Sequence, residues 1–145
     1  MTAVLWHDRV MRVAFGTDES NEVTEAVLAV LADDGHEVVD PFEDRWPDVG
    51  QRVGRVVASG AADVGVVCCW TGTGVSIAAN KVPGIRAALC TDADTARGAR
   101  RWNDANVLAL GLRLTSVAVA REIVAAFLAT GEVDPDERSN IDRLE

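Results

Sequence analysis

The segment with the clearest chemical potential is a Gly-rich turn that begins with a cysteine, Cys69-Trp70-Thr71-Gly72-Thr73-Gly74. It follows a buried apolar run and precedes a helical pattern. Its two glycines allow a tight turn whose backbone N–H groups face one point, and the start of the following helix adds partial positive charge. Such a turn binds either a phosphate group or the oxygen of an enediolate. Neither the full G-x-G-x-x-G fingerprint nor a P-loop motif is present, so on spacing alone simple binding and catalysis remain open.

Cys69 favours catalysis, because a thiolate at the end of a strand and facing a helix start serves as a base or as a nucleophile. The competing interpretation is a buried structural cysteine, which is the usual fate of a free thiol. Cys68 precedes it and therefore points to the other face of the sheet, where that structural role is expected. Cys90 is a second candidate for the core.

The rest of the chain alternates short apolar runs with longer helical patterns. Because strands that alternate with helices form parallel sheets with right-handed crossovers, we predict an α/β fold. A helix is predicted after residue 20, capped by Asp18 or Ser20, and residues 41–47 are predicted to form a loop. Five strands are predicted, at residues 12–16, 37–40, 63–69, 85–90 and 107–110.

Ligands of such sheets bind at the carboxyl ends of the strands. That rule predicts that four segments share one rim of the sheet and form the site there. The segments are residues 17–19, 69–74, 91–92 and 111–113.

Composition narrows the class of protein. The chain has 145 residues and a net charge of −9, so nucleic acid is an unexpected partner and an anionic substrate needs a local pocket. No apolar run approaches the roughly 20 residues that span a bilayer. The three cysteines lack the spacing of a disulfide framework and indicate reduced thiols in the cytoplasm. Residues 1–10 do not read as a signal peptide and are interpreted as an N-terminal extension of a single domain, residues 11–145, that ends in a helical tail.

Three segments resemble one known family. The stretch from Cys69 to Cys90 resembles the CGTGxGxSIAANKxxGIRAA pattern of ribose-5-phosphate isomerase B and galactose-6-phosphate isomerase. Residues 103–108 resemble the family's HNDANVL segment without its leading His, and residues 13–18 resemble its first strand and the Asp that follows. The resemblance covers nearly the whole chain from Met11. It implies a three-layer Rossmann-like sandwich around a five-stranded parallel sheet.

The family interconverts aldoses and ketoses without a metal or cofactor. By resemblance, Cys69 is the base that moves a proton between C1 and C2, and Thr71 is the hydroxyl residue beside the sugar oxygen. Asp18 and Asn103 match residues that contact substrate hydroxyls. The resemblance further implies a homodimer, or a dimer of dimers, whose sites are shared between subunits. The backbone amides that would hold the enediolate oxygen belong to Thr71, Gly72, Thr73, Gly74, Val75 and Ser76.

Several positions depart from the family pattern. Trp102 replaces the His that opens the sugar ring, and an indole N–H donates but accepts no proton at neutral pH. Glu19 replaces a His near the phosphate, where a carboxylate would repel the phosphate. Trp46 replaces a Tyr and Trp70 replaces a Gly beside the catalytic cysteine. Arg138 in the tail remains a candidate anion contact, although a solvated surface helix is the alternative.

These departures leave three hypotheses. The first is an aldose–ketose isomerase that uses Cys69 on a sugar or sugar derivative other than ribose 5-phosphate, either short and open-chain or without phosphate. The second is the parent reaction, interconversion of ribose 5-phosphate and ribulose 5-phosphate, with altered helper residues. The third is a non-catalytic sugar-binding subunit. The expected partner is a small sugar or sugar phosphate, with no nucleic acid, no membrane and no metal or cofactor.

Overall fold

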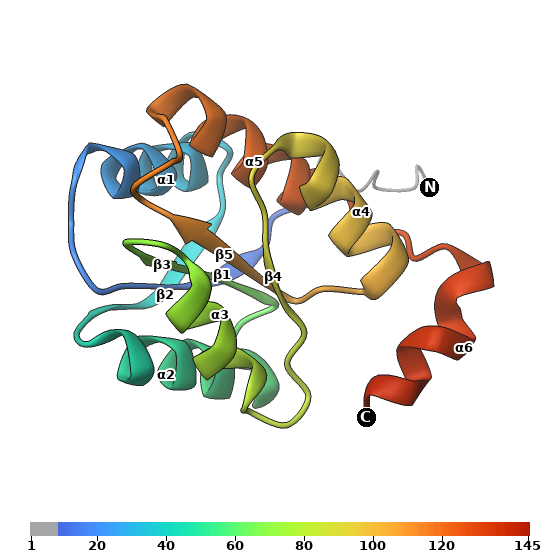
Figure 1. Ribbon diagram of the computed structural model, residues 1–145. Helices are drawn as coiled ribbons and strands as arrows, with labels where there is room; N and C mark the ends of the chain where they lie inside the picture. Colours follow the sequence, from blue (N-terminus) through green and yellow to red (C-terminus); the bar gives the residue numbers. More distant parts are fainter. Residues whose placement is uncertain (1–8) are drawn as a thin grey trace.

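A five-stranded sheet, all parallel, lies between two layers of helices in the computed structural model, which describes residues 9–145 (Figure 1). The strands are β1 (Arg12–Thr17), β2 (Glu37–Glu43), β3 (Val64–Cys69), β4 (Ala87–Leu89) and β5 (Val107–Gly111). Their order across the sheet is β2-β1-β3-β5-β4. The predicted α/β class and the five-stranded parallel sheet are therefore confirmed.

Two helical layers cover the sheet. Helices α1 (Glu22–Asp33), α4 (Ala93–Asn103) and α5 (Val117–Ala129) pack on one face, and α2 (Trp46–Ala58) and α3 (Thr73–Asn80) pack on the other (Figure 1). All six residues of β3 are buried, as expected for a central strand that has helices on both sides. A short tail follows, made of a 3-10 turn at Pro135–Glu137, α6 (Arg138–Ile141) and a 3-10 turn at Asp142–Leu144.

The two core clusters show how neighbouring cysteines separate. Cys68 belongs to the cluster beneath α1 and α5, whereas Cys69 belongs to the cluster beneath α2 and α3. This opposite placement follows from the two-residue period of a strand, and it confirms the prediction for Cys68.

The predictions for the starts of α1 and α2 were wrong. Helix α1 is capped by Asn21, not by Asp18 or Ser20, because the Asn21 side chain accepts from Val23 and Thr24 while the Thr24 hydroxyl accepts from the Asn21 backbone. Residues 41–47 are not a loop: β2 runs to Glu43 and α2 begins at Trp46. Pro47 lies in the first turn of that helix, where a proline costs no hydrogen bond.

The helix after the Gly-rich turn begins at Thr73, so Thr73 and Gly74 of that turn are already helical. The edge strand β4 has only three residues and is shorter than the predicted 85–90. The N-terminal extension predicted at residues 1–10 lies mostly outside the described residues, and only Arg9 and Val10 of it are seen. None of the helices in the described part of the chain is long and apolar enough to cross a membrane.

Candidate active site

The sheet has its switch point between β1 and β3, the two central strands whose connections leave toward opposite edges of the sheet. Crevices for ligands form at the carboxyl ends of strands at such points. Thr17 pairs with Cys68 across the two strands, and the backbone N–H of Asp18 donates to the Cys68 carbonyl (3.1 Å). Asp18 and Cys69 therefore occupy neighbouring positions on the rim, as the sequence predicted.

Cys69 is the last residue of β3 and retains 4% of its surface exposed. Its sulfur accepts a hydrogen bond from the Gly72 N–H (3.2 Å). This bond fixes the position of the sulfur at the end of β3, beside the Gly-rich turn.

The other two thiols have surroundings that suit structural roles. Burial raises the pKa of the Cys68 thiol, with smaller contributions from Cys69 and Asp18. Burial also raises the pKa of the Cys90 thiol to about 11, and its sulfur donates to the Ala88 carbonyl (3.7 Å). Both groups therefore stay protonated near neutral pH.

The turn after Cys69 depends on a left-handed residue. Gly72 has φ +77° and caps helix α3. A Cβ placed there would lie 2.5 Å from Leu89 Cδ1 and 2.8 Å from the Gly111 backbone nitrogen, so only glycine fits. The first bond of α3 runs from the Ser76 N–H to the Gly72 carbonyl, at 3.2 Å. The N–H groups of Thr73, Gly74 and Val75 lie in the first turn, where no intrahelical partner is available, and they can receive a negatively charged oxygen.

Side chains and strand ends brace this turn. The Thr71 and Thr73 hydroxyls are 2.7 Å apart and share a hydrogen bond. The N–H groups of Leu112 and Arg113 donate to the Cys69 and Trp70 carbonyls, each at 2.9 Å. The end of β5 thus holds the turn in place, which is the rigidity that an anion-binding turn needs.

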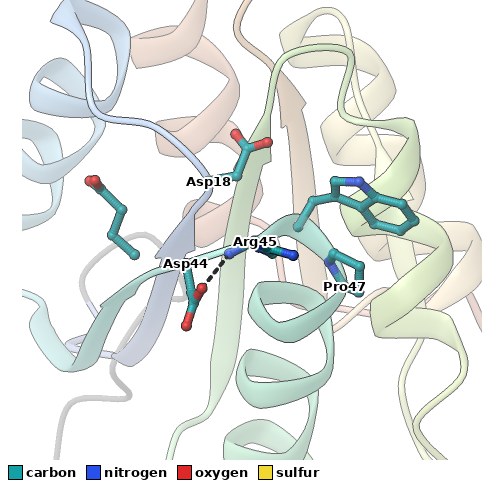
Figure 2. A pocket seen from close by; sticks show the side chains of 6 residues that line it. Asp18, Asp44, Arg45 and Pro47 are labelled. Atoms are coloured by element: carbon teal, nitrogen blue, oxygen red, sulfur yellow. Dashed lines mark hydrogen bonds between the residues drawn. The ribbon is translucent and has the colours of Figure 1, made fainter.

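Two cavities flank the turn. The larger, about 600 Å³, is lined by Asp18 and by the segment that joins β2 to α2, from Glu43 to Pro47 (Figure 2). The smaller, about 160 Å³, is lined by Trp70 and Thr71 of the turn and by Arg113 after β5. Trp46 belongs to the larger cavity and packs against the turn at Gly74, so the turn lies between the two cavities. Cys69 itself lines neither of them.

The larger cavity is acidic. Asp18 Oδ1 is buried without a hydrogen-bond partner. Burial raises the pKa of Asp18 first, and the negative charges of Glu19 and Glu43 raise it further. In Figure 2 Asp18 lies on the other side of Arg45 from Asp44, which accepts from the Arg45 N–H (2.7 Å). An unpaired carboxylate suits a substrate hydroxyl, whereas a phosphate would be repelled on this side.

Trp46 and Gly74 form a contact that sequence analysis did not foresee. A Cβ on Gly74 would lie 2.9 Å from two carbons of the indole, so the ring occupies the space above the turn. Trp46 is 45% exposed, and its ring therefore both packs against the turn and lines the larger cavity.

This contact leads to a prediction about the position of the Gly-rich turn. We expect Gly74→Ala to lower kcat by up to about 100-fold, because the added methyl collides with the indole and displaces the turn. Trp46→Ala removes the obstacle, so the double variant should be no worse than Trp46→Ala alone. Steady-state kinetics of the four proteins measure this coupling. If the fold-losses in kcat of the two single variants simply multiply in the double variant, the indole does not act on the turn through Gly74.

The structure places the remaining predicted residues in different regions. Glu19 is exposed beside Asp18 at the rim, where Thr17 Oγ1 donates to its carbonyl (2.6 Å). Val75 lies on the buried side of α3 and is fully buried, so it can contribute only its backbone to the site, and Ser76 follows it in the helix. Trp70 is 51% exposed beside the smaller cavity.

Trp102, Asn103 and Arg138 are not brought to this rim. Trp102 and Asn103 end helix α4, which runs back from the rim, and Asn103 lines a separate cavity together with Ala87 at the start of β4. Arg138 begins α6 and lies 3.4 Å from Asp104, also at the amino ends of the strands. Within one chain these three residues are therefore at the opposite end of the sheet from Cys69.

Arg113 is a residue whose role the sequence analysis missed, although its segment was placed on the rim. It lines the smaller cavity beside Trp70 and Thr71. Its position directly after β5, at the carboxyl edge of a parallel sheet, was the available signal. Among residues 9–145 no group of three or more His, Cys, Asp or Glu side chains is arranged to hold a metal ion.

The chain matches a known protein family and several of its members. Residues 13–144 match the family described as Ribose/Galactose Isomerase. The chain is 39% identical over 124 residues to the galactose-6-phosphate isomerase subunit LacB of Clostridium acetobutylicum, covering 81% of this chain and 72% of that one. It is 35% identical over 126 residues to the D-erythrulose-4-phosphate isomerase of Pectobacterium atrosepticum, covering 82% and 83%.

A solved structure agrees with these sequence matches. Type B ribose 5-phosphate isomerase of Trypanosoma brucei superposes with a TM-score of 0.82 at 40% identity, covering 94% of this chain and 97% of that one. Three proteins whose names give different substrates are thus each similar to this chain over most of its length.

Proposed function

This chain belongs to the ribose/galactose isomerase family and is an aldose–ketose isomerase, and on that premise we propose that it acts on a short, open-chain sugar substrate with Cys69 as the base. The observation that supports Cys69 as the base is the hydrogen bond from the Gly72 N–H to the Cys69 sulfur, at the switch point of the sheet. Because the family consists of isomerases, the hypothesis of a non-catalytic sugar-binding subunit is set aside.

The proposed reaction uses groups that the rim brings together. The Cys69 thiolate removes the proton from the carbon next to the carbonyl, and the resulting enediolate oxygen is held by the N–H groups of Thr73, Gly74 and Val75. The thiol then returns the proton to the neighbouring carbon, while the hydroxyl proton passes from one oxygen to the other. Asp18 accepts a hydrogen bond from a substrate hydroxyl, and the Thr71 hydroxyl lies beside the reacting oxygens.

Trp102 supports a substrate that needs no ring opening. An indole cannot exchange a proton with a ring oxygen, so a cyclic pentose phosphate would have to open without help. A tetrose phosphorylated on O4 has no free hydroxyl that can close a five-membered ring, and it is always open-chain. One relative, at 35% identity, is named as a D-erythrulose-4-phosphate isomerase. We therefore favour a four-carbon substrate over ribose 5-phosphate.

The charges around the two cavities support one orientation of that substrate. The larger cavity carries three carboxylates, Asp18, Glu43 and Asp44, against one cation, Arg45, whereas among residues 9–145 the only charged residue of the smaller cavity is Arg113. Hydroxyl groups therefore suit the Asp18 side, and a phosphate suits the Arg113 side. Glu19, exposed next to Asp18, increases this difference.

A substrate panel tests the choice of sugar. The protein is incubated with erythrulose 4-phosphate, ribose 5-phosphate and the unphosphorylated sugars, and conversion is followed by NMR. We expect turnover of the tetrulose phosphate to exceed that of ribose 5-phosphate by at least about tenfold, and Trp102→His to narrow this gap by restoring an acid–base group. Equal turnover of both substrates, with no effect of Trp102→His, would favour the parent reaction. Conversion restricted to unphosphorylated sugars would show that the phosphate is dispensable.

We also propose a cytoplasmic homodimer with shared sites. Trp102 and Asn103 are exposed and far from the Cys69 of their own chain, so they reach a catalytic cysteine only if it belongs to another copy. Trp102, Ile77 and Leu144 are more than half exposed, and such apolar side chains suit an interface. The three cysteines are free, as expected in a reducing compartment.

Complementation between two inactive variants tests whether the active sites are shared between subunits. Cys69→Ala and Asn103→Ala should each be nearly inactive alone. After the two are mixed and allowed to exchange subunits, mixed dimers should contain one site with both native residues, and the sample should recover about one quarter of wild-type activity. Subunit exchange is verified by mass spectrometry of a tagged copy. Recovery of no activity despite verified exchange would show that each site is built within one chain.

A further inference from the structure

The smaller cavity at the catalytic rim has room for only one end of a substrate. Three segments line it: Trp70 and Thr71 of the Gly-rich turn, the residues that follow β4, and the end of β5 with the residues after it. Its volume, about 160 Å³, is below the roughly 300–1,000 Å³ that is usual for a small-molecule site. Since a water molecule takes up about 30 Å³ in the liquid, the cavity holds about five groups of that size. That is the size of a phosphate group without a further carbon.

The floor of this cavity cannot move back to admit a longer chain. Gly111 is buried, and a Cβ built on it would lie 2.6 Å from the Thr71 carbonyl oxygen, so the ends of two segments are in close contact there. Cys90, which also lines the cavity, is 1% exposed and belongs to the core beneath α1 and α5. Leu89 lies against the turn, because its Cδ1 is 2.5 Å from the position of a Cβ on Gly72. The interior is close-packed at these positions, and a longer substrate gains no space from them.

Trp70 is the wall whose size can change without disturbing the core. It has the largest side chain of the residues that line the cavity within the described part of the chain, and half of its surface is exposed. Its backbone is held in place, because its carbonyl accepts from the Arg113 N–H at 2.9 Å. The indole therefore borders the cavity from a fixed point, one residue after Cys69. A substrate with its reacting carbons at Cys69 and its phosphate in the smaller cavity, as proposed above, must pass beside this ring.

We propose that Trp70 sets the length of the substrate, so that four carbons fit between Cys69 and the cavity and five do not. This inference rests on the proposed function and names the residue that makes the substrate short. Its physical basis is steric: one additional carbon in a pocket of fixed size changes the discrimination between substrates by about 10–200-fold. The length limit is independent of Trp102, which affects only substrates that need ring opening.

Two open-chain ketose phosphates separate length from ring opening. Ribulose 5-phosphate cannot close a five-membered ring on its carbonyl, because the hydroxyl that would do so carries the phosphate. It differs from erythrulose 4-phosphate by one carbon, and both are presented to the full-length protein as ketoses. If ring opening were the only obstacle to a pentose phosphate, the wild type would convert both at similar rates. A length limit predicts that ribulose 5-phosphate is still the poorer substrate.

A size series at position 70 tests the proposal, with kcat/KM for both ketose phosphates measured by NMR for wild type, Trp70→Phe and Trp70→Ala. We expect the wild type to prefer erythrulose 4-phosphate by at least about tenfold, Trp70→Ala to reduce this preference to about threefold or less, and Trp70→Phe to lie between them. For erythrulose 4-phosphate, KM should rise in Trp70→Ala because a wall contact is lost. Val10→Ala removes part of another exposed apolar side chain, before β1, and should leave the preference unchanged. Circular dichroism verifies that the variants are folded.

The outcomes distinguish the length limit from the proposed function. Equal conversion of the two ketose phosphates by the wild type, or an unchanged preference in both Trp70 variants, would overturn the length limit. Ribose 5-phosphate, the only one of these sugars that needs ring opening, tests the proposed function separately. If the wild type converts neither ketose phosphate, the proposed function fails and the length limit fails with it.

Discussion

Replacement of Cys69 by Ala should abolish turnover while leaving the fold intact. Removal of a general base costs about 10²–10⁴ in rate, so we expect kcat to fall by about 10³-fold or more. The Cys69 side chain is small and the residue lies at the end of β3 with 4% of its surface exposed, so loss of the sulfur should lower stability only slightly. NMR of substrate conversion and circular dichroism measure the two effects.

Two control variants sharpen this prediction. Cys69→Ser keeps the shape and the bond from the Gly72 N–H but supplies a far weaker base, so it should be almost as inactive as Cys69→Ala. Cys68→Ala removes the neighbouring thiol on the other face of the sheet and should retain most activity despite some loss of stability, since that thiol is fully buried. Activity that survives in Cys69→Ser but fails in Cys68→Ala would reverse the assignment.

Gly72→Ala is expected to have the second largest effect, because it acts on the anion-binding turn itself. The new methyl group would lie 2.5 Å from Leu89 Cδ1 and 2.8 Å from the Gly111 nitrogen, at a φ of +77° that alanine adopts only under strain. The turn must move, and the donors for the enediolate oxygen move with it. We expect kcat to fall by about 10²–10³-fold, the usual cost of a lost oxyanion donor, with destabilisation of about 2 kcal/mol.

Gly60→Ala is the matched control for this variant. Gly60 has a similar φ of +84°, but no atom lies within 4 Å of the position of its Cβ, and it follows α2 away from the rim. The Gly60→Ala variant should lose about 1 kcal/mol of stability from backbone strain alone, with unchanged kcat. Denaturant unfolding and kinetics separate the two contributions. If Gly60→Ala and Gly72→Ala lose activity equally, the effect is general strain and the turn has no special role.

Much of this site could be predicted because it depends on local rules. The two-residue period of a strand separates Cys68 from Cys69, and the convergence of parallel strands at their carboxyl ends brings Asp18 to the same rim. The glycines of the segment indicated a tight turn, and in that turn Gly72 adopts the left-handed conformation.

The features that were missed depend on contacts between distant segments. Trp46 rests on Gly74 because α2 and α3 pack closely, which the pattern of either helix alone does not reveal. The prediction of a loop at residues 41–47 was wrong at its end, because proline is compatible with the first turn of a helix and Pro47 lies there.

The position of Trp102 and Asn103 could not be deduced for a different reason. The family resemblance assigns both to the substrate site, yet helix α4 carries them to the other end of their own chain. Their proposed role depends on a second copy, and the arrangement of copies is a property of surfaces rather than of local sequence.

The most direct test of the central claim follows the substrate's own hydrogen. The protein is incubated with erythrulose 4-phosphate in deuterated water, and deuterium on the carbons next to the carbonyl is measured by NMR for wild type and Cys69→Ser. Transfer through a thiolate predicts deuterium in the product made by the wild type and essentially none with Cys69→Ser. Equal incorporation by both proteins would contradict the claim that Cys69 moves the proton.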